Sequence, residues 1–147
     1  MKIPVVAIIF NRPDKTKLLF KSISKYKPDK LFIISDGPRK NVLNDFEKVN
    51  ETRKIFEKIP WRCKIFTNYS NKNLGTRKRI VSGIDWVFKN VEEAIFLEDD
   101  CVPSNKFFPF MKKMLIRYKS NPKIGSIWGS NFLSKWNSNE KSYLYSK

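Results

Sequence analysis

Three consecutive acidic residues, Glu98, Asp99 and Asp100, directly follow the apolar run at residues 94–97. A short apolar run of this kind is typical of a buried strand, which would carry three carboxylates to one edge of a sheet. Adjacent carboxylates raise one another's pKa unless a cation or hydrogen-bond donors offset their repulsion. Carboxylate oxygens suit Mg²⁺ and Mn²⁺, ions that commonly bridge to substrate phosphates. The pattern predicts a divalent-metal site, and a solvated acidic turn is the alternative interpretation.

Polar residues also follow three other runs that we expect to be strands. The segments are Asn11-Arg12-Pro13, Asp36-Gly37-Pro38, and Asn73-Leu74-Gly75 followed by Thr76-Arg77. The carboxyl ends of parallel strands lie along one edge of a sheet, where open α/β sheets bind their ligands. We therefore expect these segments and the three acids to line one crevice.

Asp36, Gly75 and Arg77 each have a binding interpretation and a structural one. Asp36 can accept a hydrogen bond from the imide N–H of a base, or it can simply hold its own turn. Gly75 precedes a predicted helix whose first amides can meet a phosphate, with Arg77 nearby. A plain glycine turn is an equally common use of the same residues. The chain contains neither a GxGxxG nor a GxxxxGK[ST] motif, so dinucleotide and P-loop sites have no support.

The elements that must position these residues alternate between strand and helix patterns, which predicts an α/β fold. We expect a three-layer α/β/α sandwich with a mostly parallel sheet. The predicted strands are residues 5–10, 31–35, 64–67, 94–97 and 124–128, with residues 143–145 as a further candidate.

Four amphipathic helices are predicted between the strands. The first begins at Asp14, the second ends at Pro60, the third follows Gly75, and the fourth is capped by Ser104. Their apolar stripes are Leu18, Leu19, Ile23 and Tyr26; Phe46, Val49, Phe56 and Ile59; Ile80, Val81, Ile84, Val87 and Phe88; and Phe107, Phe108, Met111, Met114, Leu115 and Tyr118. At helical spacing such stripes are typical of core packing.

Composition limits the chemistry open to this chain. Its 147 residues, 41% of them hydrophobic, are enough for one domain with a core. The chain has no histidine, which excludes Ser-His-Asp and Cys-His pairs and histidine ligands to zinc within these residues. Cys63 and Cys101 have neither zinc nor redox spacing, which favours a reducing cytosol. The apolar N-terminal run meets Asn11 without a cleavage site of small residues, so a first strand fits better than a signal peptide.

The net charge of +16 suggests a nucleic-acid-binding module as an alternative function. The basic residues are dispersed over the chain and do not form a block, which is typical of solvated faces. A positive field can also collect phosphorylated substrates or anionic membrane surfaces. We therefore expect no nucleic-acid partner, and peripheral contact with an anionic membrane stays open.

Five stretches of sequence together point to a known family. They are IFNRP (residues 9–13), SDGPR (35–39), NLG (73–75), GIDWVF (83–88), and the segment 91–103 that contains EDDCVP, followed by Phe107 and Phe108. In this combination the chain resembles the nucleotide-diphospho-sugar transferases of the GT-A fold, above all a bacterial glycosyltransferase group also labelled hemolytic-protein-like. It is similar too to animal N-acetylglucosaminyltransferases, in which a Glu-Asp-Asp triplet takes the part of the DxD motif.

The resemblance implies a role for each matching residue. Asp100 would coordinate Mn²⁺ or Mg²⁺ on the donor's pyrophosphate, Asp99 would face the ribose or the metal's water shell, and Glu98 would face the donor sugar. The base, usually uracil, would be held by Phe10, Asn11, Arg12 and Asp36. Asn131, in Gly129-Ser130-Asn131, would contact the transferred sugar.

The resemblance also implies partners and location. The donor would be a UDP-sugar, and the acceptor a glycan or a lipid-linked precursor of a cell-surface polysaccharide, in the cytoplasm. Members of the group are longer, so residues 1–147 match the N-terminal, nucleotide-sugar-binding half and are expected to be truncated at the C-terminus. We assign no catalytic base. A non-catalytic interaction domain that keeps the transferase fold is a second alternative.

Overall fold

A parallel sheet forms the centre of the fold. The computed structural model describes residues 2–129, and within them the four strands are hydrogen-bonded in the order β3-β2-β1-β4. In chain order the elements are β1 (Val5–Ile9), α1 (Pro13–Tyr26), β2 (Lys30–Ser35), α2 (Asp45–Lys54), β3 (Lys64–Tyr69), α3 (Thr76–Phe88), β4 (Ile95–Glu98) and α4 (Phe107–Tyr118).

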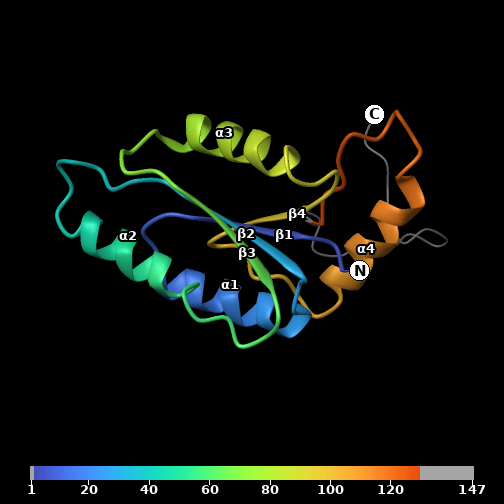
Figure 1. Ribbon diagram of the computed structural model, residues 1–147, viewed down its shortest axis with the longest axis horizontal. Helices are drawn as coiled ribbons and strands as arrows, with labels where there is room; N and C mark the ends of the chain where they lie inside the picture. The colour runs from blue at the N-terminus through green and yellow to red at the C-terminus, as the bar shows by residue number, and fades with distance from the viewer. Residues whose placement is uncertain (1, 130–147) are drawn as a thin grey trace, which may run out of the picture.

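Helices cover both faces of this sheet. Figure 1 shows α3 over one face and α1 and α2 over the other, and α4 packs into the same core as α1. The central strands are buried on both faces, which explains why β1 and β2 read as continuous apolar runs and not as alternating ones. The predicted three-layer α/β/α sandwich with a parallel sheet is confirmed.

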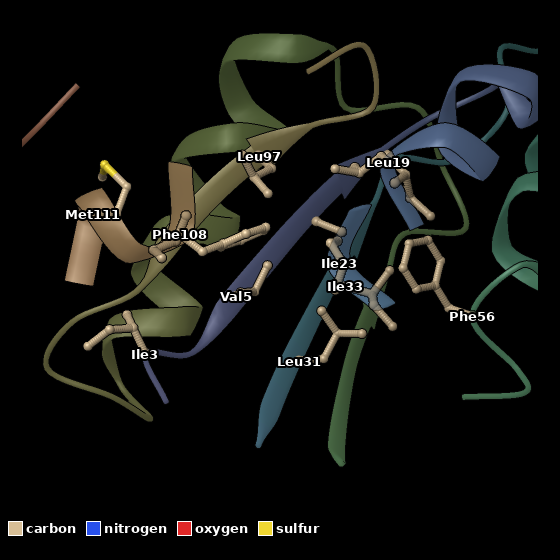
Figure 2. Packing of buried hydrophobic residues seen from close by; sticks show 13 residues of the cluster. Ile3, Val5, Leu19, Ile23, Leu31, Ile33, Phe56, Leu97, Phe108 and Met111 are labelled. Carbon is tan, nitrogen blue, oxygen red and sulfur yellow. The ribbon is translucent and has the colours of Figure 1, made fainter. Parts of the chain in front are cut away.

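Alternating residues of the strands supply two separate cores. Val5, Ala7 and Ile9 face α1, whereas Val6 faces α3 together with Phe32 and Ile34 of β2. Figure 2 shows the larger core, in which strand residues meet Leu19 and Ile23 of α1 while Phe108 and Met111 of α4 complete the cluster.

The buried face of α3 includes Val87, as predicted, but differs from the prediction at other positions. Val81 and Phe88 are exposed, and the residues turned towards the sheet are Arg79, Gly83 and Val87. A β-carbon on Gly83 would lie only 2.7 Å from Cδ1 of Ile34, so glycine allows α3 to approach the sheet closely. Leu18 of α1 and Phe46 of α2, also predicted to be core residues, are exposed as well.

Several predicted boundaries are corrected. Helix α1 begins at Pro13, one residue before Asp14, because proline suits the first helical position. Helix α2 ends at Lys54, before Pro60, and the chain then turns inward so that Phe56 packs edge-on against Phe20. Ser104 is not the cap of α4, which begins at Phe107 without a side-chain cap bond among the described residues.

Residues 124–128, predicted to be a fifth strand, form no strand. Trp128 is 81% exposed, and only Ile127 packs at the edge of the core. A short apolar run becomes a strand only where a neighbouring strand supplies hydrogen bonds, and Gly125 offers no side chain to pack. The further candidate strand at 143–145 lies outside the described residues.

Candidate functional site

The order in which the chain adds strands to the sheet reverses between β1 and β4. The chain moves from β1 to β2 and then to β3 on one side, and α3 returns it to the other side of β1, where β4 pairs in parallel. Open α/β sheets bind ligands at such a reversal, at the carboxyl ends of the strands. The segments that leave β1 and β4 at this point are Phe10-Asn11-Arg12 and Asp99-Asp100.

Arg12 joins these two segments. Its Nη1 atom donates a hydrogen bond to Oδ2 of Asp100 at 2.7 Å and lies 3.3 Å from Oδ1 of Asp99. The backbone N–H of Phe10 donates to the second oxygen of Asp99 at 3.3 Å. One cationic group is therefore shared by two adjacent carboxylates.

The two carboxylates have different environments. Asp99 is buried, and burial raises its pKa, although Arg12 and the Phe10 N–H oppose that shift. Asp100 is half exposed, and its hydrogen bond with Arg12 lowers its pKa. The same bond raises the pKa of Arg12. Asp100 is thus the more acidic and the more accessible of the pair, as a metal ligand should be.

Glu98 acts on this cluster only through its charge, which raises the pKa of Arg12 and of Asp99. It is the last residue of β4, in register with Ile8, and it is exposed. Within residues 2–129, no three acidic or cysteine side chains are grouped in a way that could hold a metal ion. Mg²⁺ typically takes one or two protein carboxylates and completes its shell with phosphates and water, so the accessible carboxylate of Asp100 is the group of this pair that such an ion could reach.

A second cluster, around Asp45, lies beside Phe10. The buried Asp45 carboxylate accepts hydrogen bonds from the backbone N–H of Arg39 at 2.8 Å and from its guanidinium at 2.9 and 3.1 Å. The side-chain amide of Asn11 donates a hydrogen bond to Oδ1 of the same carboxylate at 2.5 Å. The Arg39 bonds hold the pKa of Asp45 well below its usual range. Arg39 also lies over the Phe10 ring, 5.4 Å from its centroid.

Two of the residues predicted to hold a base, Phe10 and Asn11, contact this cluster. Asn11 is held by Asp45, and one face of Phe10 is covered by Arg39. Asp45 and Arg39 were missed as site residues because an acid in the first turn of a helix looks like an ordinary solvated residue. The position of Arg39 within the SDGPR stretch was the available signal.

Asp36 ties two loops together. Its buried carboxylate accepts from the backbone N–H groups of Gly37 at 2.9 Å, Leu74 at 2.9 and 3.1 Å, and Gly75 at 3.0 Å. A β-carbon on Gly37 would lie 2.6 Å from the backbone of Lys72, so the two loops touch. This arrangement is the one expected if Asp36 holds its turn.

Gly75 and Arg77 lie away from the acidic pair. They follow β3, the strand at the opposite side of the sheet from β4, and the N–H of Gly75 is directed to Asp36. Gly75 has a φ of +78°, which explains the glycine at this position. Arg77 is exposed in the first turn of α3. The structure therefore forms three groups along one edge: Arg12 with Asp99 and Asp100, Asp45 with Asn11 and Arg39, and Asp36 with Gly75. Within residues 2–129, Arg77 forms no hydrogen bond with any of these groups. Asn131 lies outside the described residues.

Two arginines that sequence reasoning missed, the half-buried Arg53 and the buried Arg79, hold the carboxyl ends of β2 and β3 together. Arg53 donates to Ser35 Oγ at 3.0 Å and to the carbonyls of Asp36 and Ser70 at 3.0 and 2.7 Å. Arg79 donates to the Ser35 carbonyl at 3.2 Å and to Asn68 through both its carbonyl and its side chain. Burial lowers the pKa of both guanidinium groups. The spacing of Arg79 with Gly83 and Val87 was the signal that could have identified it.

No protein-family model, curated protein or solved structure matches this chain. Among the helices in residues 2–129, none combines the length and the apolar character needed to cross a membrane. Cys63 and Cys101 are both free thiols.

Proposed function

We propose that this chain is the nucleotide-sugar-binding part of a metal-dependent glycosyltransferase. The observation that carries the proposal is the convergence of Arg12, Asp99 and Asp100 at the point where the strand order reverses. The resemblance of the surrounding motifs to GT-A transferases supports it. The donor is a UDP-sugar, and the acceptor is a glycan or lipid-linked precursor of a cell-surface polysaccharide.

Each side chain of the site has a proposed task. Asp100, accessible and acidic, would be the direct ligand of Mn²⁺ or Mg²⁺, and the buried Asp99 would fix the Phe10 backbone beside it. Such an ion, when bound, stabilises the charge that develops on a diphosphate leaving group. Phe10 and Arg39 offer a flat aromatic and guanidinium surface for a base, and Asp45 orients both Arg39 and Asn11.

We place the protein in the cytoplasm, at the inner face of the membrane. The free thiols Cys63 and Cys101 suit a reducing compartment. The net charge of +16 suits contact with anionic lipid. No residue is proposed as the catalytic base.

Isothermal titration calorimetry with UDP, with and without Mn²⁺, tests the proposal. We expect UDP binding that requires Mn²⁺. The substitution Asp100→Asn should weaken this binding at least about tenfold in affinity. The matched control is Asp85→Asn, which removes an exposed acid from α3 and should bind as the unaltered protein does. Binding that is independent of Mn²⁺ or unchanged in Asp100→Asn would remove the metal role from Asp100, and the absence of UDP binding would reject the proposal.

The same protein titrated with single- and double-stranded nucleic acid tests the main alternative. A nucleic-acid-binding module would show affinity that falls steeply with salt and that persists when the acids are neutralised. The proposal expects weak binding without preference for sequence.

A further inference from the structure

The connection between β2 and α2, together with the first turn of α2, exposes three apolar side chains. Leu43 is 87% exposed, Phe46 62% and Val42 42%. Residues 39–44 are all exposed, and Figure 1 shows this connection (teal) extending from one end of the molecule. Large apolar side chains gathered on one exposed segment are typical of an interaction surface. We name residues 40–46 the apolar loop.

The backbone of the apolar loop is held in place. The N–H of Asp45 donates to the carbonyl of Val42 at 3.2 Å, which closes a turn with Leu43 and Asn44 at its apex. Asn44 has a φ of +61°, in the left-handed region that asparagine tolerates better than most residues. The buried Asp45 then fixes the base of the loop to Arg39. Leu43 is therefore presented to solvent by an ordered turn.

The loop lies at the edge of the sheet that carries the candidate site. It follows the carboxyl end of β2. Arg39, which directly precedes the loop, lies over Phe10, and Asp45 of the loop accepts a hydrogen bond from the side chain of Asn11. Leu74, in the loop after β3, is exposed at the same edge and is tied to the β2 turn through Asp36. A partner that binds the apolar loop would therefore lie beside the proposed nucleotide-binding site.

Charge decides which partner fits the loop. Lys40 precedes the apex, and Lys48 follows it by one helical turn, bonded through its N–H to the carbonyl of Asn44 at 3.1 Å. Glu47 is the acid between them, and Asp45 is already paired with Arg39. A second copy of a chain with a net charge of +16 would be repelled, whereas an anionic surface would be attracted. Apolar side chains next to lysines on a positively charged protein are the combination that binds anionic bilayers.

We propose that the apolar loop docks this protein on an anionic lipid bilayer by inserting Val42, Leu43 and Phe46 at the interface. This inference deepens the proposed function, because it names the segment that makes the membrane contact. It would turn the edge with Arg12 and Asp100 towards the surface where a lipid-linked acceptor is held.

Sedimentation with vesicles tests the inference. The full chain is mixed with vesicles of phosphatidylcholine, or of phosphatidylcholine with phosphatidylglycerol, at low and high salt. We expect binding to the anionic vesicles, weakened at least about tenfold by Leu43→Ser with Phe46→Ser. Lys40→Gln with Lys48→Gln should weaken it less, and only at low salt. The matched control is Val81→Ser with Ile116→Ser, which removes two exposed apolar residues from α3 and α4 and should bind as the unaltered protein does.

Each other outcome overturns the inference. Equal vesicle binding by the Leu43/Phe46 variant and the unaltered chain would exclude the loop as the contact. A dimer that sedimentation velocity detects in the unaltered chain, and that the same variant dissociates, would make the loop a self-association surface. Calorimetry with UDP and Mn²⁺ on the same variants separates the two proposals, because the serine variants should retain nucleotide binding whether or not they bind lipid.

Discussion

Arg12 and Asp100, which are 88 residues apart in sequence, are joined by a hydrogen bond of 2.7 Å at the carboxyl ends of β1 and β4. The guanidinium occupies a position between two carboxylates, because it also lies 3.3 Å from Asp99. A divalent cation that binds Asp100 must compete with this group. Arg12 therefore links the acidic motif to the β1 loop and would compete with the proposed metal for Asp100.

Replacing Arg12 with glutamine should tighten the binding of Mn²⁺ alone. The side chain is half exposed, so its pair with Asp100 contributes at most about 1 kcal/mol and its loss should raise Mn²⁺ affinity by up to about fivefold. Thermal unfolding at a series of Mn²⁺ concentrations measures this. Arg12→Lys keeps the positive charge, so its Mn²⁺ affinity should lie between those of the unaltered protein and Arg12→Gln. An identical response to Mn²⁺ in all three proteins would contradict competition between Arg12 and the metal.

Asp45 should stabilise the fold at neutral pH and lose that effect in acid. Its pKa is lowered in the folded state, so its contribution is present above the ordinary value of 3.8 and is lost as the pH falls through the lower folded value. We expect Asp45→Asn to cost roughly 2 kcal/mol at neutral pH through its charge-assisted hydrogen bonds, with a difference that shrinks below pH 3.8.

Urea unfolding at several pH values measures the Asp45 effect. Glu47→Gln removes an exposed acid from the same helical turn and serves as the control, with little expected change. A difference between the unaltered protein and Asp45→Asn that does not depend on pH would show that the carboxylate charge is not what stabilises the loop.

Gly37→Ala should separate the two loops that Asp36 joins. The added β-carbon would lie 2.6 Å from the backbone of Lys72, which cannot move aside as a side-chain tip can. We expect a loss of about 1–3 kcal/mol in the free energy of unfolding, typical of overpacking. Gly125→Ala is the control, since its β-carbon would have no neighbour within 4 Å. Equal stability of the two variants in urea would refute the close contact.

Arg79→Met should destabilise the protein even though methionine fills similar space. The substitution removes the guanidinium donor from the side-chain oxygen of Asn68 and leaves the Ser35 carbonyl with only the backbone N–H of Ser70, at a cost of about 1–3 kcal/mol. Arg77→Met, two residues earlier in α3 but exposed, should be close to neutral in the same thermal unfolding experiment. If both variants unfold together with the unaltered protein, Arg79 does not hold the strand ends.

Most of the strand and helix order could be predicted from local pattern. Val5 to Ile9 and Leu31 to Ile34 are apolar without interruption, and strands buried on both faces require that composition. The acids after β4 and the polar residues after β1 follow such runs directly, so their common edge was predictable too. The pairing of Arg12 with Asp100 was not, because many basic residues could have faced the acids.

Long-range contacts decided which partners the buried polar residues have and which face of α3 is buried. Asp36 and Asp45 are hydrogen-bonded to groups 34 to 39 residues away as well as to their own loops, and sequence spacing does not reveal such partners. Hydrophobicity alone would place Val81 and Phe88 on the buried face of α3, but both are exposed. Arg79 and Gly83 are buried there instead, because Arg79 donates a hydrogen bond to the Ser35 carbonyl and Gly83 leaves space for the Ile34 side chain. Residues 124–128 have a strand-like composition but no strand beside them in the described sheet. The sequence by itself determined which residues are apolar and in what order the elements occur, and the tertiary structure decided which polar groups meet, since a buried polar group takes the partner that the packing brings to it.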